Sequence, residues 1–281
     1  MIRRDAPDGS YLLIAQHDHA LLAGQLAAQF GNERFAAPDP REPVLTGVSL
    51  HDSGWPLHDD EPTLNSRGRP LDVFEVSRPI ALRVWQASAD RAEAAEPYAG
   101  LLASLHVLAL SVFATSQTSF AHEKFDTADM TERFAINKFQ HREVERQLAL
   151  RKRLGLPTVI PLQHGLVPPG APAGEGDERL RFNFRLLQAM DLISLALCCT
   201  NPPAERTQDV YPRPGGVAVR LAMSRAGDDV RVDPWPFGVS AFSVDIPFRR
   251  VPGGAYADAN ALRDAYHHAP IESFAARVLR G

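Results

Sequence analysis

The sequence predicts a mostly α-helical protein, in which a helical bundle is followed by a small C-terminal extension that contains β-strands. Six segments before residue 200 have the apolar content and the end signals of helices, whereas β-branched runs bounded by Gly, Pro and Asp follow residue 204. The length of 281 residues gives one or two domains at about 150 residues per domain. We therefore predict a helical domain over residues 1–203 and an α+β tail, packed on that body, over residues 204–281.

The helical body is expected to begin with a short extended segment, Tyr11–Ala15, and a first helix from about Asp18 to Phe30. Asp18 is a candidate N-cap for this helix, and Gly31-Asn32 is a stop signal after it. The later helices are placed by Pro in a first turn or by Gly and Pro after an apolar or amphipathic run. They span Val44–His51, Pro79–Ala95, Pro97–Gln117, Thr131–Leu154 and Leu180–Cys199.

Segments rich in Pro, Gly or polar residues separate these helices. Ala37–Pro43 and Pro56–Pro70 are predicted loops, and Gly165–Glu178 is a predicted mobile loop or lid. The tail contains three short β-branched runs that predict strands, at Val217–Met223, Val230–Val232 and Phe242–Val251. A last helix is expected from Ala259 to about Arg280.

Composition excludes several classes of protein. The formal net charge is −4 and Lys and Arg form no long run, which argues against general nucleic-acid binding. The longest apolar stretches, Leu101–Ala114 and Leu186–Cys199, are interrupted and shorter than the roughly 20 residues that span a bilayer. The apolar run Tyr11–Ala15 is too short for a signal peptide. We expect a cytoplasmic protein with a small-molecule substrate and no nucleic-acid or membrane partner, and the sequence leaves a homodimer open.

The cysteine and histidine content limits the kind of metal site that the chain can build. The two cysteines, Cys198 and Cys199, are adjacent, which excludes a disulfide scaffold and the zinc modules that need spaced cysteine pairs. The ten histidines leave room for a site of histidine and carboxylate ligands.

Four segments place such ligands in apolar surroundings, at Gln16–Ala27, Val48–Trp55, Ala103–Leu108 and Leu187–Leu195. A single histidine on an apolar helix, such as His106, is more often a hydrogen-bonded core residue, and His51-Asp52 could simply end a helix. Asp191 is harder to explain in this way, because an unpaired buried carboxylate is very costly. Four such groups on separate helices favour convergence on a metal.

The expected cofactor is a divalent transition metal. Neutral imidazole and carboxylate suit Fe, Mn, Zn, Ni or Co, and such sites occur between the helices of bundles. The candidate ligands are His19, with His17 as its alternative, together with His51, Asp52, His106 and Asp191. Fewer than six protein ligands would leave positions for substrate and for a water that the metal activates.

The order His, His-Asp and Asp resembles the HD-domain superfamily of metal-dependent phosphohydrolases. His19 is followed by Ala23, Gly24 and Ala27 at the small-residue positions of the first motif. Leu50–Gly54 and Met190–Ser194 match the second and third motifs. The resemblance covers residues 11–200 and implies an HD-domain-like helical bundle. Trp55 stands where that superfamily usually has Lys. The whole chain also resembles a bacterial family that shares the Gln-His-Asp-His and His-Asp-x-Gly-Trp segments and has no assigned function.

Two questions about the ligands stay open at this stage. His17 and His19 are two positions apart, so a helix would point them to nearly opposite sides, and the motif register favours His19. Some members of the HD superfamily add histidines and bind two metals, and His106, or else His58 or His122, could serve that purpose here. Because the chain offers one well-placed extra histidine, we expect one ion rather than two.

The resemblance implies a metal-dependent hydrolase, with a phosphate ester as its expected substrate. Asp52 and His58 are the candidate catalytic residues, because a carboxylate and an imidazole beside a metal can accept or donate protons. Two alternatives remain: a diiron, mixed-valent oxygenase on the same scaffold, and a non-catalytic metal-binding sensor.

Overall fold

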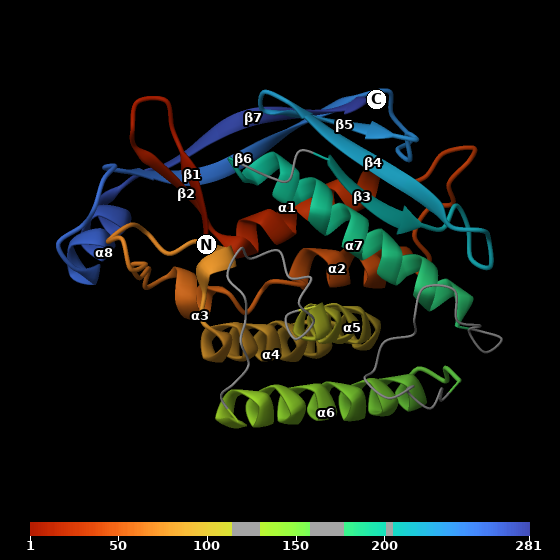
Figure 1. Ribbon diagram of the computed structural model, residues 1–281. Coiled ribbons are helices and arrows are strands. Elements are labelled where there is room, and N and C mark those ends of the chain that lie inside the picture. Colours follow the sequence, from red (N-terminus) through yellow and green to blue (C-terminus); the bar gives the residue numbers. More distant parts are fainter. Residues whose placement is uncertain (114–129, 158–176, 201–204) are drawn as a thin grey trace.

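A computed structural model of the chain describes residues 1–113, 130–157, 177–200 and 205–281 (Figure 1). Seven strands in this described part form one sheet, with the order β1-β2-β6-β7-β5-β4-β3. The strands are β1 (Ile2–Asp5), β2 (Tyr11–Ile14), β3 (Glu205–Val210), β4 (Val219–Ala226), β5 (Asp229–Asp233), β6 (Phe242–Val251) and β7 (Ile271–Arg280).

The sheet joins the two ends of the chain. β2 pairs antiparallel with β6, where Tyr11 lies opposite Val251. β6 and β7 pair antiparallel along most of their length, and β5 runs parallel to β7. The sheet is therefore mixed, and strands from the first 14 residues belong to the same hydrogen-bonded unit as strands from the last 80.

The predicted fold class is wrong, because the chain is not mostly α-helical with a small β-containing extension. A curved seven-stranded sheet forms a complete layer of the molecule (Figure 1). The strands β4, β5 and β6 lie where strands were predicted, and Tyr11–Ile14 is extended as expected. The short strand-like runs did not reveal a large sheet, because a strand is stabilised by partners that can lie far away in sequence.

The last predicted helix accounts for much of this error. Only Ala259–His268 is helical (α8), and the chain then forms the ten-residue strand β7. Pro270 separates the two elements, because proline lacks the amide hydrogen that a helix would need at that position. The end of β7 alternates between buried residues such as Ala276 and Val278 and exposed ones, which is the period of a strand.

The helices lie close to their predicted ranges. They are α1 (Gln16–Gln29), α2 (Arg41–Leu50), the short α3 (Pro56–Asp59), α4 (Arg78–Ala95), α5 (Pro97–Phe113), α6 (Met130–Arg153) and α7 (Glu178–Cys198). The segment Pro56–Pro70, predicted as a loop, thus contains α3. Almost all of the predicted loop or lid at Gly165–Glu178 lies outside the described residues, as does the end of the predicted helix Pro97–Gln117.

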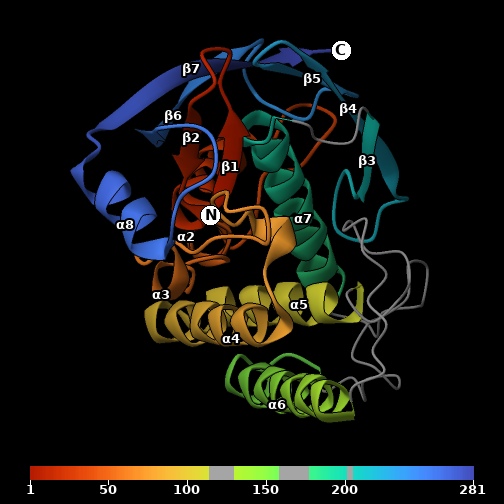
Figure 2. The same ribbon diagram turned by 60° about the vertical axis from the view of Figure 1, so that its left-hand side comes forward.

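The elements stack in layers. One face of the sheet packs on α1 and α7, and α2, α5, α4 and α6 follow below them (Figure 1). The turned view shows α8 beside one end of the sheet, near β6 (Figure 2). The largest apolar core fills the space between the sheet and α1 and α7, with Leu26, Phe182 and Val244 among its members. No helix among the described residues is long and apolar enough to cross a membrane.

Candidate metal centre

Four helical elements bring five polar side chains together in the interior. His19 lies on α1, His51 and Asp52 follow the end of α2, His106 lies on α5 and Asp191 lies on α7. All five residues are buried, and Asp191 is the most exposed of them at 9%. Their ligand atoms fall into two groups, His19 with His51 and Asp191, and His51 with Asp52 and His106, and within each group the atoms lie within 4.8 Å of one another.

The start of α1 is held by a neighbouring element rather than by its own residues. The N-cap is Ala15, which offers no side-chain hydrogen bond, so Asp18 is not the cap that the sequence suggested. Instead Asp59, at the end of α3, accepts a hydrogen bond of 2.8 Å from the backbone amide of Gln16. A carboxylate at this position is favoured by the positive end of the helix dipole. Asp59 also pairs at 2.6 Å with the terminal ammonium of Met1.

Glycine allows the His-Asp turn to pack closely on its neighbour. A Cβ on Gly54 would lie 2.0 Å from the carbonyl oxygen of Val84 and 2.6 Å from the backbone nitrogen of Ser88, both on α4. The amide of Gly54 donates a hydrogen bond of 2.9 Å to the Ser88 hydroxyl. This contact fixes the turn after α2, and with it the positions of His51 and Asp52.

The inward-facing nitrogens of the histidines surround the two carboxylates. His19 Nε2 lies 3.4 Å from both Asp52 Oδ2 and Asp191 Oδ1, and His51 Nε2 lies 3.5 Å from Asp191 Oδ1. His106 Nε2 lies 3.8 Å from Asp191 Oδ2. Ligand atoms bound at about 2.1 Å with tetrahedral angles lie roughly 3.4 Å apart, so these separations fit donors that share an ion.

Unpartnered polar atoms provide a second test of whether a metal fits. His19 Nε2, His51 Nε2 and Asp52 Oδ1 are buried and have no hydrogen-bond partner among the residues that the structure describes. The opposite nitrogen of each of these two rings is occupied: His51 Nδ1 lies 2.6 Å from the Val48 carbonyl oxygen, and His19 Nδ1 lies 2.6 Å from the Ser194 hydroxyl. Since buried polar atoms are normally paired, the free nitrogens suit a metal ion.

The electrostatics of the cluster also favour a cation. Burial would raise the pKa values of Asp52 and Asp191, but the neighbouring histidines hold both below the usual range. Burial would lower the pKa of His51, but the two carboxylates raise it to about 9, whereas burial lowers that of His106 to about 4. Two ionised carboxylates in a buried site require a compensating positive charge.

Two of the predicted site residues lie apart from the cluster. His17 is two residues before His19 on α1 and belongs to neither of the two ligand groups among the described residues. His58 is buried on α3, where its ring lies 6.2 Å from that of Trp55. No interaction described in the structure joins the His58 side chain to the five clustered residues.

Two residues of the site were not among the predicted ones. Ser194 contacts His19, and Gln16 donates a weak hydrogen bond of 3.4 Å from Nε2 to Asp52 Oδ2. Ser194 stands one helical turn after Asp191 in an apolar helix, and this spacing is the sequence feature that would have marked it.

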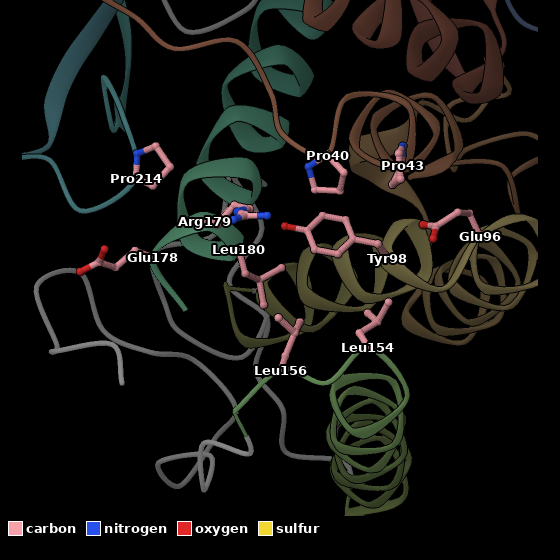
Figure 3. Close-up of a pocket in the computed structure, with 10 residues that line it drawn as sticks. All are labelled: Pro40, Pro43, Glu96, Tyr98, Leu154, Leu156, Glu178, Arg179, Leu180 and Pro214. Atoms are coloured by element: carbon pink, nitrogen blue, oxygen red, sulfur yellow. The ribbon is translucent and has the colours of Figure 1, made fainter. Parts of the chain in front are cut away.

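A separate pocket of about 480 Å³ lies where α2, α5 and α7 begin (Figure 3). Tyr98 stands at its centre and Leu180 contributes to its apolar wall. The Asn183 amide donates a hydrogen bond of 2.7 Å to the Tyr98 hydroxyl. None of the five clustered residues lines this pocket.

The fold and the cluster define a protein that combines helices with a mixed sheet and encloses a buried His/Asp site. The sequence model of the family described as "Protein of unknown function (DUF3891)" matches residues 1–253, and the chain belongs to this family. No curated protein and no solved structure matches the chain. The comparisons give no support for the HD-domain resemblance, and the expected mostly helical HD-like architecture is contradicted by the large sheet.

Proposed function

We propose that this protein is a metal-dependent hydrolase whose substrate is a small-molecule phosphate ester. The observation that carries the proposal is the set of buried, unpartnered atoms His19 Nε2, His51 Nε2 and Asp52 Oδ1, which lie in one cluster with Asp191. Three imidazoles and two carboxylates are ligands that suit Fe, Mn, Zn, Ni or Co. The phosphate ester is the substrate class expected from the order of the sequence motifs.

Each residue has a defined part in this proposal. His19, His51, His106, Asp52 and Asp191 would hold a single ion, in keeping with the separations between their ligand atoms. A bound divalent ion supplies Lewis acidity and lowers the pKa of a coordinated water. Asp52 would also be the proton acceptor, because its Oδ1 has no hydrogen-bond partner among the described residues while its Oδ2 faces His19.

Metal analysis of the purified full chain tests the first step of the proposal. We expect one transition-metal ion per chain, and we expect Asp191→Asn to lose it, because Asp191 faces His19, His51 and His106. Asp72→Asn is the matched control, since Asp72 caps a short 3₁₀ helix and lies outside the cluster. A wild-type protein that contains no metal and binds none on addition would overturn the proposal.

A panel of phosphate monoesters and diesters then tests the reaction. We expect metal-dependent release of phosphate or of the alcohol by the wild type, and none by Asp191→Asn. A fully loaded protein without turnover on phosphate esters or in oxygenation assays would exclude the hydrolase and favour a metal-binding sensor.

One observation favours a second candidate, a diiron oxygenase. The ligand atoms form two groups, one with Asp191 and one with Asp52, and each carboxylate could serve a separate ion, although the single free nitrogen of His51 can bind only one of them. Two irons per chain and a mixed-valent signal in electron paramagnetic resonance would support the oxygenase. A single redox-silent ion would support the hydrolase.

A further inference from the structure

Ser194 lies directly behind the metal-facing side of the cluster. It is completely buried on α7, one turn after Asp191. Its Oγ lies 2.8 Å from the carbonyl oxygen of Asp191 and 2.6 Å from Nδ1 of His19. The hydroxyl therefore connects two of the elements that carry candidate ligands, α7 and α1.

The chemistry of the three groups fixes the direction of both hydrogen bonds. The Asp191 carbonyl can only accept, so the single hydrogen of the Ser194 hydroxyl is donated to it. The hydroxyl oxygen is then left to accept, and the His19 ring must donate its Nδ1 hydrogen to it. In a neutral imidazole this arrangement leaves Nε2 with a free lone pair.

We propose that Ser194 is a positioning residue that holds His19 in the tautomer protonated at Nδ1 and so directs the Nε2 lone pair toward the metal. The second part of this inference rests on the proposed metal centre, whereas the tautomer itself does not. A partner of this kind on the far nitrogen of a ligating histidine typically changes metal affinity by about 10- to 100-fold.

His51 provides an internal comparison for His19 within the same site. The Nδ1 of His51 lies 2.6 Å from the Val48 carbonyl, so the main chain accepts the Nδ1 hydrogen of this ring as Ser194 accepts that of His19. No side-chain substitution removes that carbonyl, whereas the partner of His19 is a side chain and can be removed. Replacing Ser194 should therefore change His19 and leave His51 as it was.

The alternative state of His19 explains why the serine matters. Without an acceptor beside Nδ1, the ring gains a hydrogen bond only by carrying its proton on Nε2, which lies 3.4 Å from oxygens of Asp52 and Asp191. A proton at that atom occupies the lone pair that a metal needs. The substituted protein would have to release this proton before binding.

Ser194→Ala and Ser111→Ala form a matched pair of variants. Ser111 is also buried, also donates to the carbonyl three residues earlier (2.7 Å to Leu108), and also accepts from a side-chain nitrogen, Nε2 of Gln140 at 3.2 Å. It does not touch the cluster, so Ser111→Ala reports the cost of losing a buried helix serine. Circular dichroism checks that both variants fold.

The first measurement is nitrogen-15 NMR of the histidine rings in metal-free full-length protein, at a pH where His19 is neutral. We expect Nδ1-protonated His19 in the wild type and in Ser111→Ala, and a shift of the proton to Nε2 in Ser194→Ala, with His51 unchanged. His19 signals that are the same in Ser194→Ala and the wild type would overturn the inference.

The second measurement is the affinity for Zn²⁺, obtained by competition with a chelator. We expect Ser194→Ala to bind Zn²⁺ about 10- to 100-fold more weakly than Ser111→Ala. Equal affinities in the two variants would overturn the role in metal binding. If the wild type bound no metal at all, the proposed function would fail, while the NMR result would still decide whether Ser194 sets the tautomer.

Discussion

Replacing Gly54 by alanine should destabilise the protein and weaken its metal site together. The new Cβ would lie 2.0 Å from the carbonyl oxygen of Val84 and 2.6 Å from the backbone nitrogen of Ser88. Both atoms belong to the main chain of α4, so no side-chain rotation relieves the contact, and the turn or the helix must move. Such overpacking costs about 1–3 kcal/mol.

The displaced turn also loses a buried hydrogen bond. The Gly54 amide donates to the Ser88 hydroxyl at 2.9 Å, and its loss adds about 1 kcal/mol. The two effects together reduce the free energy of unfolding by about 3 kcal/mol. An unfolding entropy of about 2.1 cal/mol/K per residue converts this to a fall of roughly 5 °C in Tm for a chain of this length.

Differential scanning calorimetry and metal analysis of Gly54→Ala check both expectations. The matched control is Ser53→Ala, because the buried Ser53 hydroxyl has no hydrogen-bond partner within the described part of the chain, so its removal breaks no bond seen there. We expect the control to keep its Tm within about 1 °C and its metal content. A Gly54→Ala protein with the Tm and the metal affinity of the wild type would refute the reasoning that this glycine places His51 and Asp52.

Three further predictions concern other parts of the fold. In the metal-free protein, burial lowers the pKa of His106 to about 4, whereas the unfolded chain has a value of about 6.5. Between these pH values the proton binds mainly to the unfolded chain, so the free energy of unfolding should fall by about 3 kcal/mol as the pH drops from about 6.5 to about 4. Urea unfolding at both pH values should show this loss in the wild type and a smaller one in His106→Gln. A Cβ on Gly24 would lie 2.0 Å from Ser49 Oγ, so Gly24→Ala should lower the free energy of unfolding by about 1 kcal/mol. Adding Ser49→Ala should recover part of this loss because the obstacle is a side chain, and additive losses in the double variant would contradict the explanation. Arg151 pairs with buried Asp177 at 2.8 and 3.1 Å, and Arg151→Ala would leave the carboxylate without this partner. Chemical denaturation should show a free energy of unfolding lower by about 3–5 kcal/mol, and a loss below about 1 kcal/mol would show that the pair contributes little.

The helical elements could be predicted because their causes are local. Proline in the first turn of α4 and at the first residue of α5 fixes where these helices begin, and Asn201-Pro202-Pro203 follows the end of α7. The sheet could not be predicted in the same way. β2 is four residues long and pairs with β6, more than 230 residues later, and nothing within either segment specifies that pairing.

In the candidate site, too, local sequence indicated the residues, and only the tertiary structure brought them together. His19 was favoured over His17 by the small residues that follow it, and Asp191 by the cost of burying a carboxylate in an apolar helix. The sequence also offered His106 as a candidate ligand, although a single histidine on an apolar helix is usually a core residue. Only the packing of α5 against α2 and α7 brings its ring 5.0 Å from that of His51.

The sequence by itself therefore determined most of the helices and named all five residues of the cluster, since these depend on residue type and short spacings. The tertiary structure decided the rest: the single sheet that joins the two ends of the chain, the gathering of three histidines with two carboxylates, and the contacts of Ser194 and Gln16 beside them. These features depend on contacts between residues far apart in the chain. Such contacts form only where whole helices and strands pack, and local sequence carries little information about that packing.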